Sequence, residues 1–250
     1  MSRYPRYAIY YAPAPDHRLH EFGSRVIGYN AFDGRDAPLL DGIEDAVEDW
    51  HELTRDPRRY GFHATLKAPF HLARGQTEAG LRAACTEFAG MARRIPTIVP
   101  QVGSIDGFVA VIPAAPVEQL AALARDCVAD FDHFRAPLTD DDRKRRNASA
   151  LTPRQRDYLE RWGYPYVMDE FRFHMTLTGR LGGDRREAVI DILSRRFSSL
   201  DLPELAIDRV VLFRQDDVTS RFSMVEQYPI SAAAAPANLL QVEAAVDDPL

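Results

Sequence analysis

Two copies of one short motif contain the residues of this chain that are best suited to catalysis. Phe62-His63-Ala64-Thr65-Leu66 recurs as Phe173-His174-Met175-Thr176-Leu177, in a sequence that contains only 7 His. A single His-x-Thr is ordinary on a half-exposed strand, because Thr favours strands and His tolerates intermediate burial. Two copies in matching context indicate instead one active site to which each copy contributes.

In a β-strand, the side chains of each motif separate into a polar and an apolar set. Residues two apart point to the same face, so His63, Thr65 and Lys67 are expected together, opposite apolar neighbours. The second copy repeats this division with His174 and Thr176. The sequence therefore predicts an imidazole beside a hydroxyl twice.

Two imidazoles that face one cleft can divide acid and base work. The unperturbed pKa of histidine, about 6.5, allows one ring to be neutral and the other protonated near neutral pH. In the hydrolysis of a phosphodiester, either His63 or His174 would activate water, and the other would protonate the departing oxygen. Thr65 and Thr176 would donate hydrogen bonds to the non-bridging oxygens, where negative charge is held in the transition state. This scheme needs no metal.

A metal-assisted reaction fits the sequence less well. Two His ligands normally require a third His, Asp or Glu, and no acidic residue stands at motif spacing from His63 or His174. The two cysteines, Cys85 and Cys127, each fall on an apolar helical stripe and lack a Cys-x-x-Cys partner. We expect neither a metal site nor another cofactor.

The order of the predicted elements repeats along the chain. Lobe one, at about 6–103, and lobe two, at about 107–230, each read as strand, helix, motif strand, helix and strand. A helical insertion at about 135–170 has no counterpart in the first half, and we expect it to shape or cover the site. The sequence therefore predicts a single bilobal α+β domain over 1–230, followed by a C-terminal tail over 231–250.

Capping signals mark two helices of the second half. Thr152-Pro153-Arg154-Gln155 predicts a helix start in the insertion, and this helix is expected to end at Trp162-Gly163. Asp184 with Glu187 three residues later resembles a capping box and predicts the start of the next helix.

Composition places the chain among ordinary globular proteins. It has 250 residues, 46% hydrophobic and 27% charged. No stretch approaches the roughly 18 to 20 apolar residues of a membrane span, and Met1–Pro15 is a poor secretory signal, so we expect a cytoplasmic protein without membrane contact. The formal net charge of −6 argues against a broad nucleic-acid surface.

The paired motifs resemble those of the 2H phosphoesterase superfamily, whose members include cyclic phosphodiesterases and RNA-ligase-like enzymes. The resemblance runs from Arg6 to about Tyr228. Three further phrases resemble a narrower branch of phosphonate-metabolism proteins: Arg59-Tyr60-Gly61-Phe62-His63-Ala64-Thr65-Leu66-Lys67, Phe134-Arg135-Ala136-Pro137-Leu138 and Trp162-Gly163-Tyr164-Pro165-Tyr166-Val167.

The resemblance implies a fold, a site and an activity. The fold is bilobal with a pseudo-two-fold axis, two antiparallel sheets flanked by helices, and the active cleft between the lobes. His63 and His174 become the catalytic pair, with Thr65 and Thr176 as their phosphate-binding companions. The implied activity is hydrolysis of a small cyclic phosphate of a ribose or nucleotide, and the phosphonate branch favours a cyclic ribose phosphate.

Three further residues are candidates for substrate binding. Lys67 can offer a point charge to phosphate, although a solvated surface lysine has the same pattern. Arg135 can clamp a phosphate with two hydrogen bonds. Tyr164 can contact a sugar or base from the insertion, although an aromatic residue beside Pro165 is more often a packing residue. The basic run Arg143–Arg146 reads most simply as a solvated helix face.

Two other functions remain open at this level. One is processing of RNA ends that carry a 2′,3′-cyclic phosphate, for which the acidic net charge is unfavourable. The other is a noncatalytic sensor of a phosphorylated ligand, although binding alone would not require two groups suited to proton transfer. The expected partner is a small phosphorylated substrate, and the sequence makes no prediction about oligomeric state.

Overall fold

The computed structural model describes residues 4–146 and 148–233 as an α+β fold on antiparallel strands. The strands are β1 (Arg6–Tyr11), β2 (Tyr29–Asn30), β3 (Arg35–Asp36), β4 (Ala64–His71), β5 (Thr97–Ile98), β6 (Pro100–Ile105), β7 (Phe108–Pro113), β8 (Met175–Arg180), β9 (Leu205–Ala206), β10 (Arg209–Gln215) and β11 (Ser223–Pro229). The helices are α1 (Arg18–Ile27), α2 (Ile43–Ala46), α3 (Trp50–Leu53), α4 (Arg55–Tyr60), α5 (Glu78–Gly90), α6 (Glu118–Asp130), α7 (Asp140–Arg145), α8 (Pro153–Trp162) and α9 (Gly183–Ser198). The predicted tail falls largely outside the described residues.

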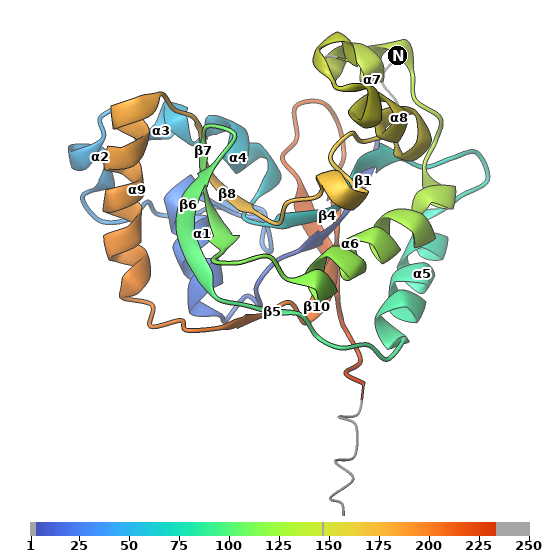
Figure 1. Cartoon of the computed structure of the whole chain (residues 1–250), viewed down its shortest axis with the longest axis horizontal. Helices are drawn as coiled ribbons and strands as arrows, with labels where there is room; N and C mark the ends of the chain where they lie inside the picture. Colours follow the sequence, from blue (N-terminus) through green and yellow to red (C-terminus); the bar gives the residue numbers. More distant parts are fainter. Residues whose placement is uncertain (1–3, 147, 234–250) are drawn as a thin grey trace, which may run out of the picture.

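One seven-stranded sheet runs through the molecule in the order β11-β10-β1-β4-β8-β7-β6 (Figure 1). All neighbouring strands in it are antiparallel. The two motif strands, β4 and β8, are neighbours in the middle of the sheet, with Ala64 opposite Met175. The two antiparallel sheets expected from the sequence are therefore β11-β10-β1-β4 and β8-β7-β6, and they meet between the motifs.

The two halves of the chain exchange segments across this junction. Strands β10 and β11, from the second half of the chain, lie beside β1 of the first half. Strand β6, from the first half, pairs with β7 of the second half. The helices exchange in the same way, since α1 contacts β8 and α6 contacts β4. The two crossing connections pair as β5 and β9, with Thr97 opposite Ala206. The predicted lobes at 6–103 and 107–230 were wrong for this reason, because each lobe contains strands and helices from both halves of the chain.

A tight hairpin lies where the sequence suggested a boundary between lobes. Asp106 and Gly107 connect β6 to β7, and their φ angles are 48° and 87°. Two central residues with positive φ are the mark of a type I′ turn, for which Asp-Gly is a preferred pair. The segment between 103 and 107 therefore joins two paired strands.

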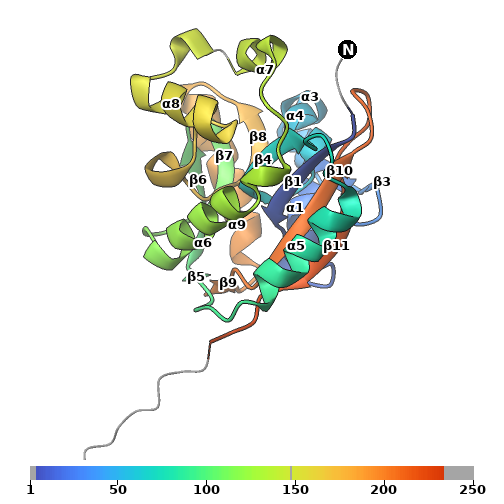
Figure 2. The same ribbon diagram turned by 90° about the vertical axis from the view of Figure 1, so that its right-hand side faces the viewer.

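The apolar faces of the helices cover the sheet and form one core. Helix α5 packs on β10 and β11, which Figure 2 shows side by side, and α9 packs on β6 and β7. Ile9, Leu66, Val111 and Leu177 are at most 2% exposed in this core. Cys85 and Cys127 are buried free thiols, as their apolar stripes predicted.

Local details of the helices agree in part with the sequence. The capping box at Thr152 and Gln155 is present, and Gly163 ends α8 in the left-handed conformation. Helix α9 instead begins at Gly183 after Gly182, without a side-chain cap, so the start predicted at Asp184 was wrong. The segment from Ile43 to Tyr60 forms the three short helices α2, α3 and α4.

The insertion contributes α7 and α8, which lie together at the opposite end of the molecule from α9 (Figure 1). A bridge between Leu72 and Arg135 ties the start of this segment to the chain beyond β4. Within the described ranges, no helix combines the length and the apolar character that crossing a bilayer requires.

Candidate active site

His63 lies immediately before β4 and is fixed by two polar contacts. Its Nδ1 donates a hydrogen bond to the Gly61 carbonyl at 2.9 Å, so in the neutral ring Nε2 is unprotonated and accepts from Thr65 Oγ1 at 3.3 Å. Gly61 ends α4 with a φ of 79°, and a Cβ there would stand 2.6 Å from Cβ of Ala31. A glycine is therefore required at the turn that presents the carbonyl to His63.

Aromatic rings surround the His63 imidazole. Tyr10 of β1 stacks on it with ring centroids 3.6 Å apart and an interplanar angle of 20°. Tyr60 and Phe213 lie at centroid distances of 6.4 and 6.2 Å. Burial in this enclosure, with a smaller contribution from the charge of His174, lowers the pKa of His63 to about 4. The ring is therefore neutral at physiological pH.

His174 has the same backbone contact in a different environment. Its Nδ1 donates to the Arg172 carbonyl at 2.8 Å, again leaving Nε2 unprotonated in the neutral ring. Burial lowers the pKa of His174, while the bond to Arg172 and the negative charge of Asp106 raise it in part. Asp106 in turn lies 3.7 Å from the Arg172 guanidinium, measured from Oδ1 to Nη1. His174 thus has a carboxylate nearby to stabilise its protonated form.

Strand register brings the two motifs together. With Ala64 opposite Met175 in antiparallel pairing, His63 is opposite Thr176 and Thr65 is opposite His174. These four side chains alternate with the buried Ala64 and Met175, so they share one face of the sheet. Directly opposite residues have Cβ atoms about 4.5–5.5 Å apart. Each imidazole therefore lies between the threonine of its own motif and that of the other.

Thr65 and His174 of this face line a cavity of about 480 Å³, whose lining does not include His63 or Thr176. Its walls come from both motif strands, from the β6–β7 turn and from the insertion. They include Thr65, His174, Asp106, Tyr164, Arg172 and Arg180. The volume lies within the range of small-molecule sites, about 300–1,000 Å³. Two arginines and two carboxylates, Asp106 and Glu170, give the rim both signs of charge.

The structure does not bring Lys67 to this cavity. Its side chain is 3% exposed, and Nζ donates to the Val128 carbonyl and to Asp132 Oδ1, each at 2.9 Å. Two register shifts between β1 and β4 lie on either side of its pairing with Ile9. Alternation breaks at such irregularities, so the face predicted from a period of two does not extend from Thr65 to Lys67.

Arg135 also has a structural role. Its Nε and Nη2 bind the two oxygens of Asp132 at 2.9 and 3.1 Å, and Nη2 donates to the Arg161 carbonyl at 3.0 Å. A Cβ on Gly163 would stand 2.7 Å from Cδ of Arg135. This arginine therefore ties the insertion to the domain, and its charge is satisfied by Asp132.

Tyr164 lines the cavity, and its contact with a sugar or base stays a prediction. The guanidinium of Arg146 lies 4.7 Å from the centroid of its ring, and Tyr166 makes an edge contact at 5.5 Å. Burial raises the pKa of the Tyr164 phenol, so the group is a neutral hydrogen-bond donor at physiological pH. Its placement depends on the left-handed turn at Gly163 that precedes it.

Two residues of the site, Tyr10 and Asp106, lie outside the motifs. Tyr10 is two residues before the end of the first predicted strand, and its face could be assigned only once the register of β1 and β4 was known. Asp106 precedes Gly107, and Asp-Gly between two apolar runs is a strong hairpin signal. That signal would have placed a carboxylate at the end of a strand beside the second motif.

The described residues contain no group of three or more His, Cys, Asp and Glu arranged to hold a metal ion. The reaction without metal remains a prediction that needs a chelation experiment.

Fold and site together define a class of protein. It is an antiparallel α+β protein with two His-x-Thr strands side by side, and one residue of each motif, Thr65 and His174, lines a common cavity. The chain belongs to the family described as "Protein of unknown function (DUF1045)", whose model matches residues 65–223. The match therefore begins at Thr65 of the first motif and includes the whole of the second.

Two curated relatives are both called "Ribose 1,5-bisphosphate phosphokinase PhnN". The protein from Janthinobacterium sp. (strain Marseille) is 33% identical over 240 residues, covering 94% of this chain and 52% of the relative. The protein from Laribacter hongkongensis (strain HLHK9) is 35% identical over 178 residues, covering 70% of this chain and 40% of the relative. The chain spans about half the length of the curated relatives it matches.

Solved structures show weaker likeness. A structure described as "Crystal structure of phosphoesterase" gives a TM-score of 0.39 at 13% identity over 91% of this chain and 99% of that one. The E. coli LigT structure complexed with NADP+ gives 0.41 at 12% identity over 92% and 99%. At these TM-scores neither likeness supports an assignment of function.

Proposed function

We propose that this protein is a cyclic phosphodiesterase that opens a small cyclic phosphate without a metal, with His63 and His174 as base and acid. The observation that carries the proposal is the shared polar face of β4 and β8. Both imidazoles donate through Nδ1 to a backbone carbonyl, and so direct Nε2 away from that carbonyl. The sensor alternative gives no reason for two imidazoles held in this way.

The surroundings of the two rings suggest which is the base. His63, neutral because of its aromatic enclosure, would accept a proton from water at Nε2 as the water oxygen bonds to phosphorus. His174, beside Asp106, would donate the proton from Nε2 to the ester oxygen that leaves phosphorus. Thr65 and Thr176 would donate hydrogen bonds to the non-bridging oxygens, where the developing charge is greatest. Product release then leaves the two histidines with exchanged protonation states, which solvent resets.

A cyclic phosphate of ribose is the substrate we favour. The relatives' name refers to ribose 1,5-bisphosphate, and that compound forms when water opens a 1,2-cyclic phosphate of ribose 5-phosphate with cleavage of the bond to O2. The phosphokinase activity in the name is not carried over. Lys67 and Lys144, the only lysines, lack the preceding glycine of a Gly-Lys-Ser/Thr phosphate-binding loop.

A nucleoside 2′,3′-cyclic phosphate is the second candidate. The cavity of about 480 Å³, with Tyr164 and Phe108 in its wall, has room and aromatic surface for a base in addition to the sugar. A mononucleotide would satisfy this observation without the extended basic track that an RNA end requires.

A phosphorus NMR time course in EDTA tests the proposal. The panel contains the ribose 1,2-cyclic phosphate with a 5-phosphate, 2′,3′-cyclic nucleotides and a linear diester. Ring opening by the wild type should persist in EDTA and fall by about 10²–10⁴-fold in His63→Ala and in His174→Ala. His133→Ala, a change of an exposed histidine outside the motifs, is the matched control. Near-normal turnover in either motif variant, or none of any substrate by the wild type, would contradict the proposal.

A further inference from the structure

Two arginines near the catalytic face have no carboxylate partner among the described residues. Arg6 of β1 is 7% exposed, and its guanidinium donates only to Oε1 of Gln215. Arg146, at the end of α7, is half-buried and its guanidinium contacts the ring of Tyr164. A buried guanidinium normally has an anion beside it, because desolvation of an unpaired charge is costly.

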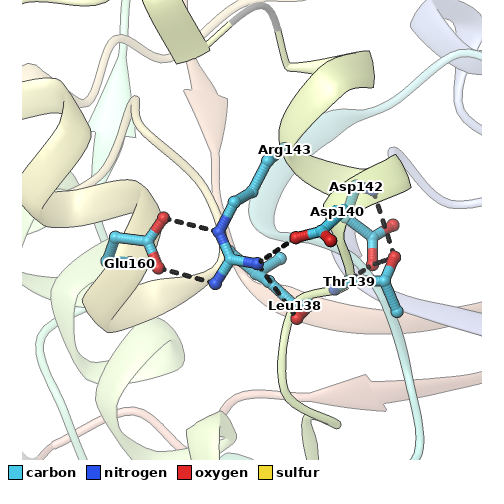
Figure 3. A network of polar contacts seen from close by, with 6 residues as sticks. All are labelled: Leu138, Thr139, Asp140, Asp142, Arg143 and Glu160. Atoms are coloured by element: carbon cyan, nitrogen blue, oxygen red, sulfur yellow. Dashed lines mark hydrogen bonds and ion pairs between the residues drawn. The ribbon is translucent and has the colours of Figure 1, made fainter.

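Arg143 shows how an arginine of the same helix behaves when its charge is satisfied. Its Nε and Nη2 bind the two oxygens of Glu160 at 2.9 Å each, and Nη1 lies 3.3 Å from Asp140 (Figure 3). Arg143 thus links α7 to α8 through a bidentate ion pair with Glu160. Arg146, three residues further along, has no such partner among the residues that the structure describes, and it extends toward the cavity wall at Tyr164.

Tyr10 connects these arginines to the catalytic histidine. Arg6 and Tyr10 are four residues apart on β1, so their side chains lie on one face of the strand. The ring of Tyr10 is 1% exposed and stacks on His63, yet its hydroxyl makes no hydrogen bond with any described residue. Both side chains lie against the ring of Phe222, with the Arg6 guanidinium 5.3 Å and the Tyr10 ring centroid 6.3 Å from its centroid. Arg6 and Arg146 line one small cavity. Burial raises the pKa of the Tyr10 phenol, and the charges of these two arginines oppose the rise.

We propose that Arg6, Arg146 and the Tyr10 hydroxyl form a subsite for a second phosphate group of the substrate, adjacent to the catalytic pair. The proposal rests on the proposed function and narrows it to substrates that carry a phosphate monoester besides the cyclic phosphate. Two guanidinium groups and a phenol hydroxyl match the acceptor oxygens of a phosphate dianion. Such a group would supply the anion that Arg6 and Arg146 lack.

The space between the two arginines also predicts a movement on binding. The cavity lined by Arg6, Arg146 and Gly163 measures about 30 Å³, room for about two water molecules. A phosphate enters when Arg146 leaves the ring of Tyr164 and moves outward with the end of α7. The bound phosphate then replaces the ring as the partner of Arg146.

Matched substrates test the subsite. The pair is the ribose 1,2-cyclic phosphate with a 5-phosphate and the same compound with a free 5-hydroxyl. We expect Arg146→Gln to lower kcat/KM for the substrate with the 5-phosphate by about 10- to 100-fold. The kcat/KM for the substrate with the free 5-hydroxyl should change by less than about two-fold. Tyr10→Phe, which keeps the ring on His63, should lower the ratio of kcat/KM for the phosphorylated substrate to kcat/KM for the unphosphorylated one by about five-fold. Arg143→Gln should leave the ratio of the two kcat/KM values unchanged. An equal loss for both substrates in Arg146→Gln would overturn the subsite.

Calorimetry separates failure of the subsite from failure of the proposed function. Ribose 5-phosphate is titrated into the wild type, Arg146→Gln and Arg143→Gln, with ribose as the uncharged control. The subsite predicts that Arg146→Gln raises the Kd of ribose 5-phosphate by about ten-fold or more, whereas Arg143→Gln does not. This result would support the subsite even if no cyclic phosphate were hydrolysed. An unchanged Kd, or no binding by the wild type, would refute it.

Discussion

His63 and His174 share a local geometry but not a chemical environment. Each donates from Nδ1 to the carbonyl two residues earlier, at 2.9 and 2.8 Å. The first ring is stacked on Tyr10 among aromatic side chains, and the second lies near Asp106 at the rim of the cavity. The backbone of the motif therefore fixes the tautomer, while the neighbouring elements set the tendency of each ring to bind a proton.

This contrast follows from the exchange of segments between the halves. Tyr10 comes from β1 on the β4 side of the sheet, whereas Asp106 comes from the β6–β7 turn on the β8 side. Neither residue belongs to a motif, so a symmetric pair of strands can hold two histidines with different roles. A fixed assignment of acid and base within a duplicated motif requires this difference, because two identical rings would have the same affinity for a proton.

The largest effects on turnover are expected from substitution of His63 or His174. Substrates with different leaving groups distinguish the base from the acid. His63→Ala and His174→Ala should each reduce turnover of an alkyl phosphodiester by about 10²–10⁴-fold. A substrate with an acidic phenol as leaving group needs little protonation, so His174→Ala should recover much of its rate on it, whereas His63→Ala should not. Steady-state rates on the two substrates measure this. Recovery in His63→Ala alone would reverse the assignment of acid and base.

Substitutions of the two threonines should have equal effects on kcat, in contrast to the different roles proposed for the two histidines. Thr65→Val and Thr176→Val remove one hydrogen-bond donor each from the non-bridging oxygens, and each should lower kcat by about 10²-fold, the effect of losing a single oxyanion donor. Neither substitution should shift the pH dependence. An effect confined to Thr65 would show that its contact with His63, 3.3 Å in the free protein, matters more than phosphate binding.

Asp106→Asn should act through the pH dependence of catalysis. The carboxylate favours the protonated form of His174, so its removal lowers the pKa of His174. The acid is then lost at lower pH, and the alkaline limb of kcat/KM should move to lower pH, with a several-fold loss at neutral pH. The acidic limb, set by His63, should stay in place. The control is Asp49→Asn, since Asp49 pairs with Arg185 outside the cavity lining.

Motif spacing, strand alternation and capping signals were sufficient to predict much of the molecule. The two motif strands, β4 and β8, and the helix α8 lie where the patterns placed them. These features depend on neighbours within a few residues, which a single sequence displays. The position of each histidine on the same face as the threonine of its own motif follows from the same local rules.

Pairing between distant strands had no such local signal. Apolar strands of similar length can pair in several orders, so nothing in β10 or β6 identified its partner. The sequence also could not show which face of β4 the side chain of Lys67 occupies. That face depends on the register shifts on either side of the pairing between Lys67 and Ile9. Arg135 differs, because its carboxylate partner Asp132 stands only three residues before it in the sequence. Only its second partner, the Arg161 carbonyl, depends on the folding of the insertion.

The smallest effect on catalysis is expected from substitutions of Lys67 and Thr178. These residues stand two positions after Thr65 and Thr176, the threonines of the two motifs. Both are buried and bind protein groups: Lys67 binds Asp132, and Thr178 accepts from the Val109 N–H at 3.1 Å and donates to the Gly179 carbonyl. Lys67→Met and Thr178→Val leave these partners unsatisfied, which should lower the free energy of unfolding by about 1–3 kcal/mol.

In the folded fraction of each variant, kcat/KM should change by less than about two-fold, because neither side chain reaches the cavity. Denaturant titrations with activity assays on the same samples decide this. A ten-fold loss of kcat/KM in Lys67→Met at unchanged stability would instead place Lys67 at the substrate.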